Sequence, residues 1–444
     1  MTERPLIDRQ PKVERALVLH PARSSASGSV RSPNARLDEA VGLALALDLD
    51  ICGAEVVNLR AAVPATLFGT GKVREIEDLC ENLEVSIVVV DDALTPVQQR
   101  NLEKAWEVKV IDRTGLILEI FARRARTREG KLQVELARLA YERSRLVRTW
   151  THLERQRGGF GVMGGPGETQ IETDRRLIAE KITKLKAQLV EVRRTRSLHR
   201  DARKRTPFPT VALVGYTNAG KSTLFNRLTE GGVLAKDMLF ATLDPTLREL
   251  KLPDGRPAIM SDTVGFISDL PHELVESFRA TLEEVQSADL ILHVRDIADP
   301  DTLAQARDVE TVLDRMGLEE DRRVRLIEVW NKLDLLPEDE RGVVHARAIR
   351  SGETGVSAVP VSAVTGEGVA ELLDLIASRI DDAQPVDAFF GPGDGEAVAW
   401  LYRNGRVVER AEDEAGGVRL RVKLEPQALG RFERLYPDAL NRAE

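Results

Sequence analysis

The sequence lacks the apolar segments of membrane and secreted proteins. No stretch of its 444 residues approaches the run of about eighteen apolar residues that a membrane-spanning helix needs. The first fifteen residues, MTERPLIDRQPKVER, are charged and contain no apolar core like that of a secretory signal. We therefore expect a cytoplasmic protein without a membrane span, and partial association with membranes stays open as an alternative.

Cysteine and histidine are scarce as well. The two cysteines, Cys52 and Cys80, do not have the spacing of metal ligands, and the six histidines do not cluster in the sequence. So few thiols are typical of a reduced protein rather than of a disulfide framework. We expect no metal site built from these two residue types.

Positive charge, in contrast, is concentrated in one segment. The chain has a net charge of −8, but residues 123–205 sum to +13 and the rest of the chain to −21. Two basic runs, 123–157 and 175–205, flank a stretch without any lysine or arginine. In an acidic protein, such a segment predicts a directed contact with a polyanion, and a solvated helical face is the alternative.

Hydrophobic patterning predicts four regions along the chain. Apolar strands alternate with helices in the first region, which predicts a mostly parallel sheet. The second reads as two long helices, one within 115–157 and one over 173–204, joined by the glycine-rich run 159–170. After a linker at 206–210 a second alternating region follows, then a boundary rich in proline and glycine at 383–392, a helix at 395–403, a hairpin through 406–424 and a final helix. The predicted domains are 1–122, 123–206, 207–382 and 383–444.

A phosphate-binding loop opens the third region. The strand VALVG runs into GYTNAGKS, which matches G-x-x-x-x-G-K-[ST] at Gly215, Gly220, Lys221 and Ser222, and an apolar helix follows. Backbone N–H groups of such a loop converge on phosphates. Lys221 would bring positive charge to the β- and γ-phosphates, and the Ser222 hydroxyl would bind Mg²⁺.

Further nucleotide motifs follow in order, at strand ends where open α/β sheets bind ligands. In DTVG, Asp262 would reach Mg²⁺ through water and the Gly265 N–H would bind the γ-phosphate. FATLDPT offers Thr242 as a Mg²⁺ ligand; it is favoured over Thr246 because the aromatic residue before it resembles the pattern in related GTPases. Lys221 and Gly265 are the predicted catalytic residues.

The last two motifs predict that the base is guanine. In NKLD, Asp334 can accept from N1–H and the N2 amino group, a donor pair that adenine lacks. Asn331 would tie the base loop to the phosphate loop, Lys332 would cover the base, and the Ser362–Ala363 backbone in VPVSA would meet guanine O6. The full set of predicted nucleotide-binding residues is Gly215, Tyr216, Thr217, Asn218, Ala219, Gly220, Lys221, Ser222, Thr223, Phe240, Ala241, Thr242, Leu243, Asp244, Asp262, Thr263, Val264, Gly265, Asn331, Lys332, Asp334, Ser362 and Ala363.

One position departs from the pattern of Ras-like enzymes. Phe266 follows D-x-x-G, where those enzymes place the glutamine that orients water. A phenyl ring cannot orient water. We therefore expect slow intrinsic hydrolysis of GTP, of the order of 10⁻³ s⁻¹ or less, and acceleration by a macromolecular partner.

The glycine-rich run GFGVMGGPGETQ does not fit a second nucleotide site, because it follows no strand and has no Lys-[ST] ending. It lies between the two basic runs, and its small residues could enter a narrow space lined by RNA. A hairpin tip without contacts is the alternative. The predicted RNA-contact residues are Arg155, Arg157, Gly158, Gly159, Gly161, Gly164, Gly165, Gly167, Arg175 and Arg176.

These segments together resemble the HflX family of translation-factor-class GTPases. The resemblance covers nearly the whole chain and includes FGTGKVREI (68–76), DDALTPVQQRNLE (91–103), residues 112–141, RGGFGVMGGPGETQIETDRR (157–176), GYTNAGKSTLFN, FATLDPT, DTVGFI and NKLD. The chain is similar to that family at Phe266 as well, because HflX proteins belong to the hydrophobic-substituted GTPases. The C-terminal segment is the most variable part of such proteins.

The resemblance implies a function as well as a fold. It implies a GTPase that binds the large ribosomal subunit and its RNA, splits ribosomes and leaves after GTP hydrolysis, with Mg²⁺ as cofactor, and we expect a monomer. A ribosome-assembly GTPase that acts on immature RNA is the alternative, and a signalling GTPase with a protein partner is a third. The predicted fold class is α/β: an N-terminal βα subdomain with a long helical hairpin, a P-loop GTPase domain with a doubly wound, mostly parallel sheet, and a small C-terminal α+β domain.

Overall fold

The structure is a computed structural model of the chain. It describes residues 14–23, 31–156, 166–204, 208–229, 239–240, 242–243, 246–268, 284–318, 325–380, 385–391, 393–412, 417–424, 426–437 and 439–441. The chain divides into two compact units, Met1–Asp374 and Leu375–Glu444. No helix in these described ranges is long and apolar enough to cross a membrane.

The first unit begins with a four-stranded parallel sheet, as predicted. Its strands are β1 (Arg15–Arg23), β2 (Asp50–Leu59), β3 (Ile87–Val90) and β4 (Lys109–Asp112), in the order β2-β1-β3-β4. Alternate residues of β1 and β3 point to opposite faces. One face packs on α1 (Pro33–Leu45) and α4 (Arg113–Arg124), and the other on α2 (Thr70–Asn82) and α3 (Pro96–Trp106).

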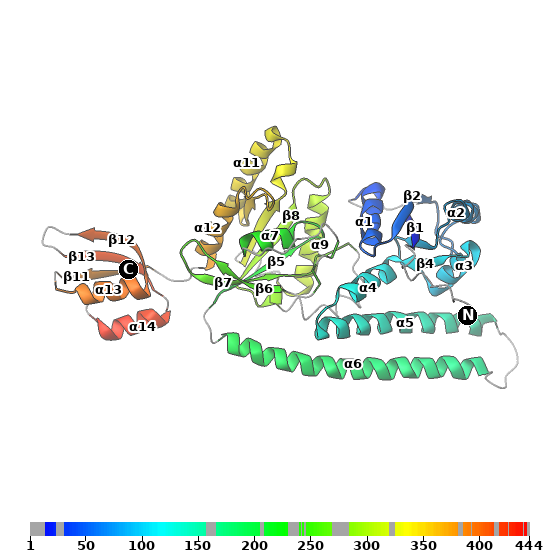
Figure 1. The fold of residues 1–444 in the computed structure, drawn as a ribbon, viewed down its shortest axis with the longest axis horizontal. Coiled ribbons are helices and arrows are strands. Elements are labelled where there is room, and N and C mark those ends of the chain that lie inside the picture. The colour runs from blue at the N-terminus through cyan, green and yellow to red at the C-terminus, as the bar shows by residue number, and fades with distance from the viewer. Residues whose placement is uncertain are drawn as a thin grey trace, which may run out of the picture. The chain divides into compact units, whose positions relative to one another are not determined.

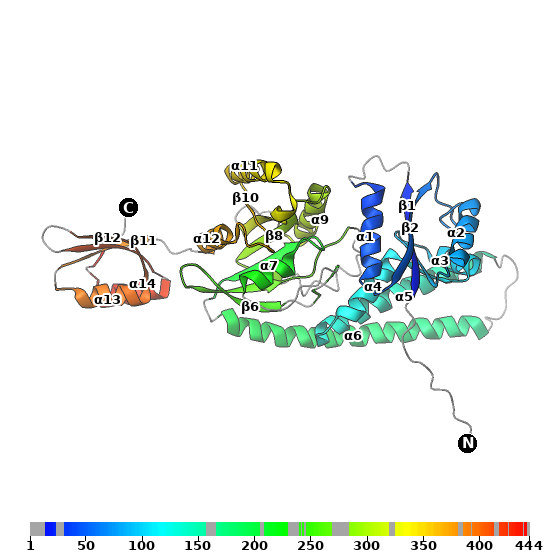
Figure 2. The ribbon, with the colours of Figure 1, turned by 45° about the horizontal axis from the view of Figure 1, so that its top comes forward.

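Two long helices, α5 (Arg128–Gln156) and α6 (Pro166–Lys204), then run side by side (Figures 1 and 2). Their seam is apolar and is formed by Leu132, Leu136 and Leu139 against Ile178, Ile182 and Leu185. We call this pair the helical hairpin. The predicted helical pair is therefore confirmed, but its ends differ from the prediction.

One difference is a break between α4 and α5, where the sequence predicts helix throughout 115–157. Ala125 adopts extended backbone (φ −61°, ψ 113°), and the Thr127 hydroxyl accepts from the Gly130 N–H at 2.9 Å, which caps the next helix. The other difference is that α6 begins at Pro166 rather than at 173, so Gly167 is helical and not part of a loop. Proline is favoured at a first helical position because its missing N–H needs no partner there.

The third region forms a six-stranded sheet in the order β10-β9-β8-β5-β7-β6. Its strands are β5 (Thr210–Gly215), β6 (Thr246–Lys251), β7 (Pro257–Asp262), β8 (Leu290–Asp296), β9 (Leu326–Asn331) and β10 (Ser357–Pro360). Only β6 is antiparallel to its neighbour, which confirms the mostly parallel sheet. The helices described with it are α7 (Lys221–Leu228), α9 (Thr302–Arg315), α11 (Glu338–Thr354) and α12 (Val369–Ile380).

The second unit contains an antiparallel sheet in the order β12-β13-β11-β14 with two helices. The predicted helix, hairpin and final helix correspond to α13 (Gly395–Asn404), β12 (Arg406–Glu412) with β13 (Val418–Lys423), and α14 (Pro426–Leu435). The strand β11 (Pro385–Phe390) lies within the predicted boundary 383–392, and neither β11 nor β14 (Leu440–Asn441) was predicted. In β11, Val386, Ala388 and Phe390 alternate into the core around Phe432, so burial outweighs the flanking proline and glycine.

Candidate nucleotide site

A cavity of about 390 Å³ lies where the phosphate loop, the D-x-x-G segment and the base motifs meet. It brings together residues from loops that follow four different strands of the six-stranded sheet. Leu335 and Val364 also line it and were not predicted; both are apolar neighbours of predicted base residues. The lining residues are Thr217, Asn218, Gly220, Lys221, Ser222, Thr223, Phe240, Thr242, Thr263, Gly265, Asn331, Lys332, Asp334, Leu335, Ala363 and Val364.

The phosphate loop needs its last glycine for two reasons. Gly220 has φ +90°, a left-handed conformation that disfavours side chains, and it is the residue before α7. A Cβ at this position would stand 2.2 Å from the Asn331 Nδ2 atom. The loop can therefore approach the base motif closely only because no side chain is present at Gly220.

Lys221 is buried, and its ammonium group faces the loop itself. Its Nζ donates to the backbone carbonyls of Gly215 at 3.1 Å and Tyr216 at 2.7 Å. Burial lowers the pKa of Lys221 to about 8, although the charge of Asp262 opposes the shift. A buried cation held mainly by carbonyl dipoles can be satisfied better by an anion, which is what a phosphate would provide.

The side-chain oxygens of three predicted metal-binding residues converge near Lys221. The Ser222 hydroxyl donates to Asp262 Oδ2 at 2.7 Å, Thr242 Oγ1 donates to the same oxygen at 2.8 Å, and the two hydroxyls are 2.9 Å apart. The other carboxylate oxygen, Oδ1, is buried without a hydrogen-bond partner among the described residues, and burial raises the pKa of Asp262. Hydroxyl and carboxylate oxygens are the donor set that hard divalent cations prefer. Thr246, in contrast, begins the edge strand β6 and does not line the cavity.

At the base end, one asparagine joins three motifs. Asn331 Nδ2 donates to the Ala219 carbonyl and its Oδ1 accepts from the Ala363 N–H, each at 2.9 Å. The Ser362 hydroxyl donates to Asp334 Oδ1 at 2.6 Å, which orients that carboxylate. These three hydrogen bonds connect the phosphate loop, NKLD and the VPVSA loop.

Arg227 supports the same loop from α7, and sequence reasoning missed it. Its Nε donates to the Ala363 carbonyl at 2.7 Å, and its Nη2 donates to the Val364 carbonyl. Arginine in a helix after a phosphate loop gives no signal by itself, because the partner lies more than a hundred residues away in the sequence.

Phe266 does not line the cavity. Its side chain is 2% exposed and lies in an apolar cluster with Phe240 and Val264. Its backbone pairs with the phosphate loop: its N–H donates to Gly215 O at 3.0 Å, and its carbonyl accepts from the Thr217 N–H at 2.7 Å. The backbone after D-x-x-G is thus hydrogen-bonded to the phosphate loop.

Several other predicted residues lie around the cavity rather than in its wall. The non-lining residues that the structure describes are Gly215, Tyr216, Ala219, Leu243, Asp262, Val264 and Ser362. Ala241 and Asp244 lie outside the described residues.

Four of the predicted RNA-contact residues lie in the described helices of the helical hairpin. Arg155 lies in α5 and Gly167 in α6, while Arg175 and Arg176 are exposed on α6. Arg176 Nε lies 3.8 Å from Glu180 Oε1, an exposed pair that contributes little to stability. The remaining predictions lie outside the described residues: Arg157, Gly158, Gly159, Gly161, Gly164 and Gly165.

Comparison with protein families matches four consecutive segments. Residues 34–122 match "GTP-binding GTPase N-terminal", 124–203 "GTP-binding GTPase Middle Region", 210–332 "50S ribosome-binding GTPase" and 348–439 "HflX C-terminal domain". These boundaries follow the order of the regions seen in the structure.

Whole-chain relatives agree with the family matches. The chain is 53% identical to the GTPase HflX of Magnetococcus marinus over 398 residues, which cover 89% of this chain and 90% of that protein. It is 45% identical to the GTPase HflX of Escherichia coli (strain K12) over 366 residues, covering 82% and 84%. The crystal structure of SsGBP in complex with GDP matches with a TM-score of 0.50 at 22% identity, covering 82% of this chain and 98% of that one, and shows the shared fold.

Proposed function

Because the chain belongs to the HflX family of GTPases and is itself a GTP hydrolase, we propose that it binds the large ribosomal subunit and dissociates ribosomes, with GTP hydrolysis controlling its release. The observation that carries this proposal is the combination, in one compact unit, of a nucleotide cavity with a long helical hairpin rich in arginine and lysine. A nucleotide can then control what the hairpin binds.

In the cavity, each predicted residue has a task that its contacts support. Lys221 would exchange its carbonyl partners for the β- and γ-phosphates, and the Gly265 N–H would bind the γ-phosphate. Asp334, oriented by Ser362, would accept from guanine N1–H and N2. Asp334 is half-buried here, and a carboxylate covered by adenine would lose water without gaining these donors, which is how the site would reject ATP.

The oxygens of Ser222, Thr242 and Asp262, the last through water, would hold Mg²⁺. That ion would neutralise negative charge on the phosphates. The close approach of these oxygens and the unpartnered Asp262 Oδ1 support this assignment.

Phe266 carries no group that can activate water, and its side chain is buried away from the cavity. We therefore propose that Lys221 and Gly265 stabilise the developing charge, but that intrinsic hydrolysis stays slow until the ribosome supplies or orders the missing group. We therefore expect GTP hydrolysis to be much faster on the ribosome than in the free protein.

On the hairpin, Arg155, Arg157, Arg175 and Arg176 would contact RNA phosphates, with the glycines of 158–167 making a narrow tip. The proposal includes a cytoplasmic monomer, which can bind a large particle through one surface. A ribosome-assembly GTPase would use the same surface on immature RNA.

Sedimentation tests these alternatives directly. Intact ribosomes are incubated with the protein and GTP, a non-hydrolysable GTP analogue, GDP or ATP, and then separated on a sucrose gradient. Appearance of free subunits with GTP or its analogue, but not with GDP or ATP, is the expected result. Binding only to precursor particles would favour the assembly role, and no binding to any particle would reject both.

A further inference from the structure

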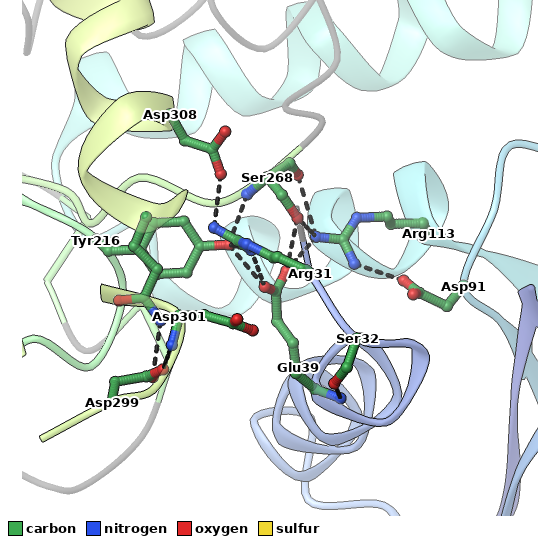
Figure 3. A network of polar contacts seen from close by, with 12 residues as sticks. Arg31, Ser32, Glu39, Asp91, Arg113, Tyr216, Ser268, Asp299, Asp301 and Asp308 are labelled. Atoms are coloured by element: carbon green, nitrogen blue, oxygen red, sulfur yellow. Dashed lines mark hydrogen bonds and ion pairs between the residues drawn. The ribbon is translucent and has the colours of Figure 1, made fainter. Parts of the chain in front are cut away.

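A buried polar network joins the nucleotide domain to the N-terminal sheet (Figure 3). Its centre is the hydroxyl of Tyr216 in the phosphate loop, which donates to Glu39 Oε2 at 2.6 Å. The same hydroxyl accepts from Arg31 Nη1 at 2.7 Å and from the Ser268 N–H at 2.8 Å. Arg31 also donates to Asp308 of α9 at 2.6 Å. Tyr216, Ser268 and Asp308 thus meet two residues from the N-terminal region of the chain.

Ser268 is the residue that the N-terminal sheet holds most completely. Arg113 Nη2 donates to the Ser268 carbonyl at 3.1 Å and to its hydroxyl at 3.0 Å, and Ser268 Oγ lies 3.1 Å from Glu39 Oε1. Arg113 is buried and also pairs with Glu39 and Asp91. Burial alone would lower the pKa of Arg113, but these two carboxylates raise it, so the guanidinium stays charged.

The position of this contact in the sheet is informative. The strand order β2-β1-β3-β4 reverses between β1 and β3, and open α/β sheets bind ligands outside the strand ends at such a reversal. Asp91 directly follows β3, and His20 lies in β1 beside that strand end, with its Nδ1 2.8 Å from Asp91 Oδ2. Arg113, which follows β4, extends from this pair to Ser268. The N-terminal sheet therefore uses its ligand-binding edge to hold a residue that lies three positions after Gly265.

The residue next to Arg113 holds the helical hairpin. Asp112 caps α4 by accepting from the Gly115 N–H at 2.8 Å. It also accepts from Tyr141 Oη and from Arg145 Nη2 of α5, both at 2.6 Å. Asp112 and Arg113 are adjacent in the chain, at the junction of β4 and α4. Arg113 contacts Ser268 after the D-x-x-G segment, and Asp112 contacts α5 of the helical hairpin.

We propose that Arg113 is a positioning residue for the segment that carries Gly265, and that the Asp112–Arg113 junction couples this segment to the helical hairpin. Gly265 can bind a γ-phosphate only when GTP is present, so GTP and GDP favour different positions of the segment. Ser268 is too fully paired to move without moving or re-pairing Arg113. By reciprocity, whatever the hairpin binds changes the relative affinity for GTP and GDP. Only the identity of that bound surface, the ribosome, rests on the proposed function.

The coupling is tested on the full chain without ribosomes. Hydrogen exchange of α5 over 128–145 is measured with GDP and with a non-hydrolysable GTP analogue, in the wild type, Ser268→Ala and Arg113→Lys. Ser268→Ala removes only a hydroxyl, and Arg113→Lys keeps the charge but loses the planar group that can bridge Ser268 and Asp91. Arg123→Lys, on the same helix α4 but outside the network, is the matched control.

The wild type and the control are expected to show about a fivefold difference in exchange between the two nucleotides, and both variants less than about twofold. The ratio of GTP-analogue to GDP affinity should fall by a similar factor, while GDP affinity stays within about threefold of wild type. The double variant Ser268→Ala with Arg113→Lys should show the same exchange difference and affinity ratio as Arg113→Lys alone, because both substitutions remove one contact. Equal exchange in the wild type with both nucleotides, or an unchanged difference in both variants, would overturn the coupling.

A general loss of folding would lower GDP affinity and melting temperature together, so the milder Ser268→Ala decides the question if Arg113→Lys is unstable. Ribosome sedimentation by the wild type is a separate measurement. A protein with normal coupling but no ribosome binding would reject the proposed function and leave the coupling intact. A protein that binds ribosomes but shows no nucleotide-dependent exchange would do the reverse.

Discussion

The nucleotide cavity and the helical hairpin hold their charged groups in opposite ways. In the cavity, Lys221 is 6% and Asp262 is 2% exposed, and each is paired with named atoms. On the hairpin, Arg175 and Arg176 are exposed, and an apolar seam joins the two helices among the residues whose side chains the structure describes. The effect of a buried charge depends on the exact position of its partner, because leaving that charge buried without a partner costs free energy. Exposed basic side chains contribute to binding a polyanion through their total charge. We therefore expect a single substitution on the hairpin to lower affinity much less than one in the cavity.

Removing the buried cation is the strongest way to test this contrast. Lys221→Ala should lower kcat/KM for GTP by about 10³-fold, because it removes the buried cation of the phosphate loop that would bind the β- and γ-phosphates. The measurement is single-turnover GTP hydrolysis together with binding of a fluorescent GTP analogue. Lys251→Ala, an exposed lysine on β6 of the same domain, is the control and should leave both unchanged. A loss of less than about tenfold for Lys221→Ala would break the contrast.

Base recognition should respond somewhat less, because one of several base contacts changes. Asp334→Asn should weaken GTP binding by about 10²-fold, since guanine N1–H and N2 lose their acceptor. The same variant should gain affinity for xanthosine triphosphate, which carries an oxygen where guanine has N2. Competition binding with the two nucleotides measures the switch. Asp339→Asn on the exposed start of α11 is the matched control, and equal loss of both nucleotides would indicate misfolding instead.

The support behind the base loop should have a smaller effect again. Arg227→Gln leaves the carbonyls of Ala363 and Val364 without their charged donor, which should weaken GTP and GDP equally, by about tenfold. Because Arg227 does not line the cavity, kcat at saturating GTP should stay within about twofold. Isothermal titration and steady-state kinetics separate the two, with Arg307→Gln on α9 as control. A change in kcat without a change in affinity would show that Arg227 does not act through the base loop.

These residues also show what the sequence can and cannot predict. The strand–loop–helix around Lys221 and the strand ends at Asp262 and Asn331 are local patterns, so their convergence follows from the parallel sheet alone. The roles of Arg227 and Arg113 depend on contacts with residues 136 and 155 positions away in the sequence. Their local sequence does not distinguish them from other arginines.

The errors in the helices and strands have different causes. The break before α5 depends on the Thr127 cap, a signal that the uninterrupted helical pattern of 115–157 conceals. The strand β11 was not predicted because its proline and glycine content marks 383–392 as a boundary, although its alternation of apolar residues was visible. The first error thus hides a local cap, whereas the second was decided by tertiary packing of β11 around Phe432.

The hairpin should give the smallest effect per residue, and a different kind of effect. Arg175→Gln together with Arg176→Gln should weaken binding to the large ribosomal subunit only about fivefold near physiological salt. The slope of log affinity against log salt should become shallower by about 1 to 2, because up to two phosphate contacts are lost. GTP affinity without ribosomes should not change, since neither side chain approaches the cavity.

The control for this pair is Arg431→Gln with Arg434→Gln on α14, which removes the same charge from two exposed arginines of the second unit. If both pairs change the salt slope equally, the hairpin contributes no more than net charge, and the directed contact with RNA is wrong. If the α6 pair alone abolishes binding at every salt concentration, its arginines act like the buried groups of the cavity. In that case the contrast between geometry and summed charge fails for this molecule. A shallower slope with modest loss of affinity, confined to α6, is the result that a polyelectrolyte contact requires.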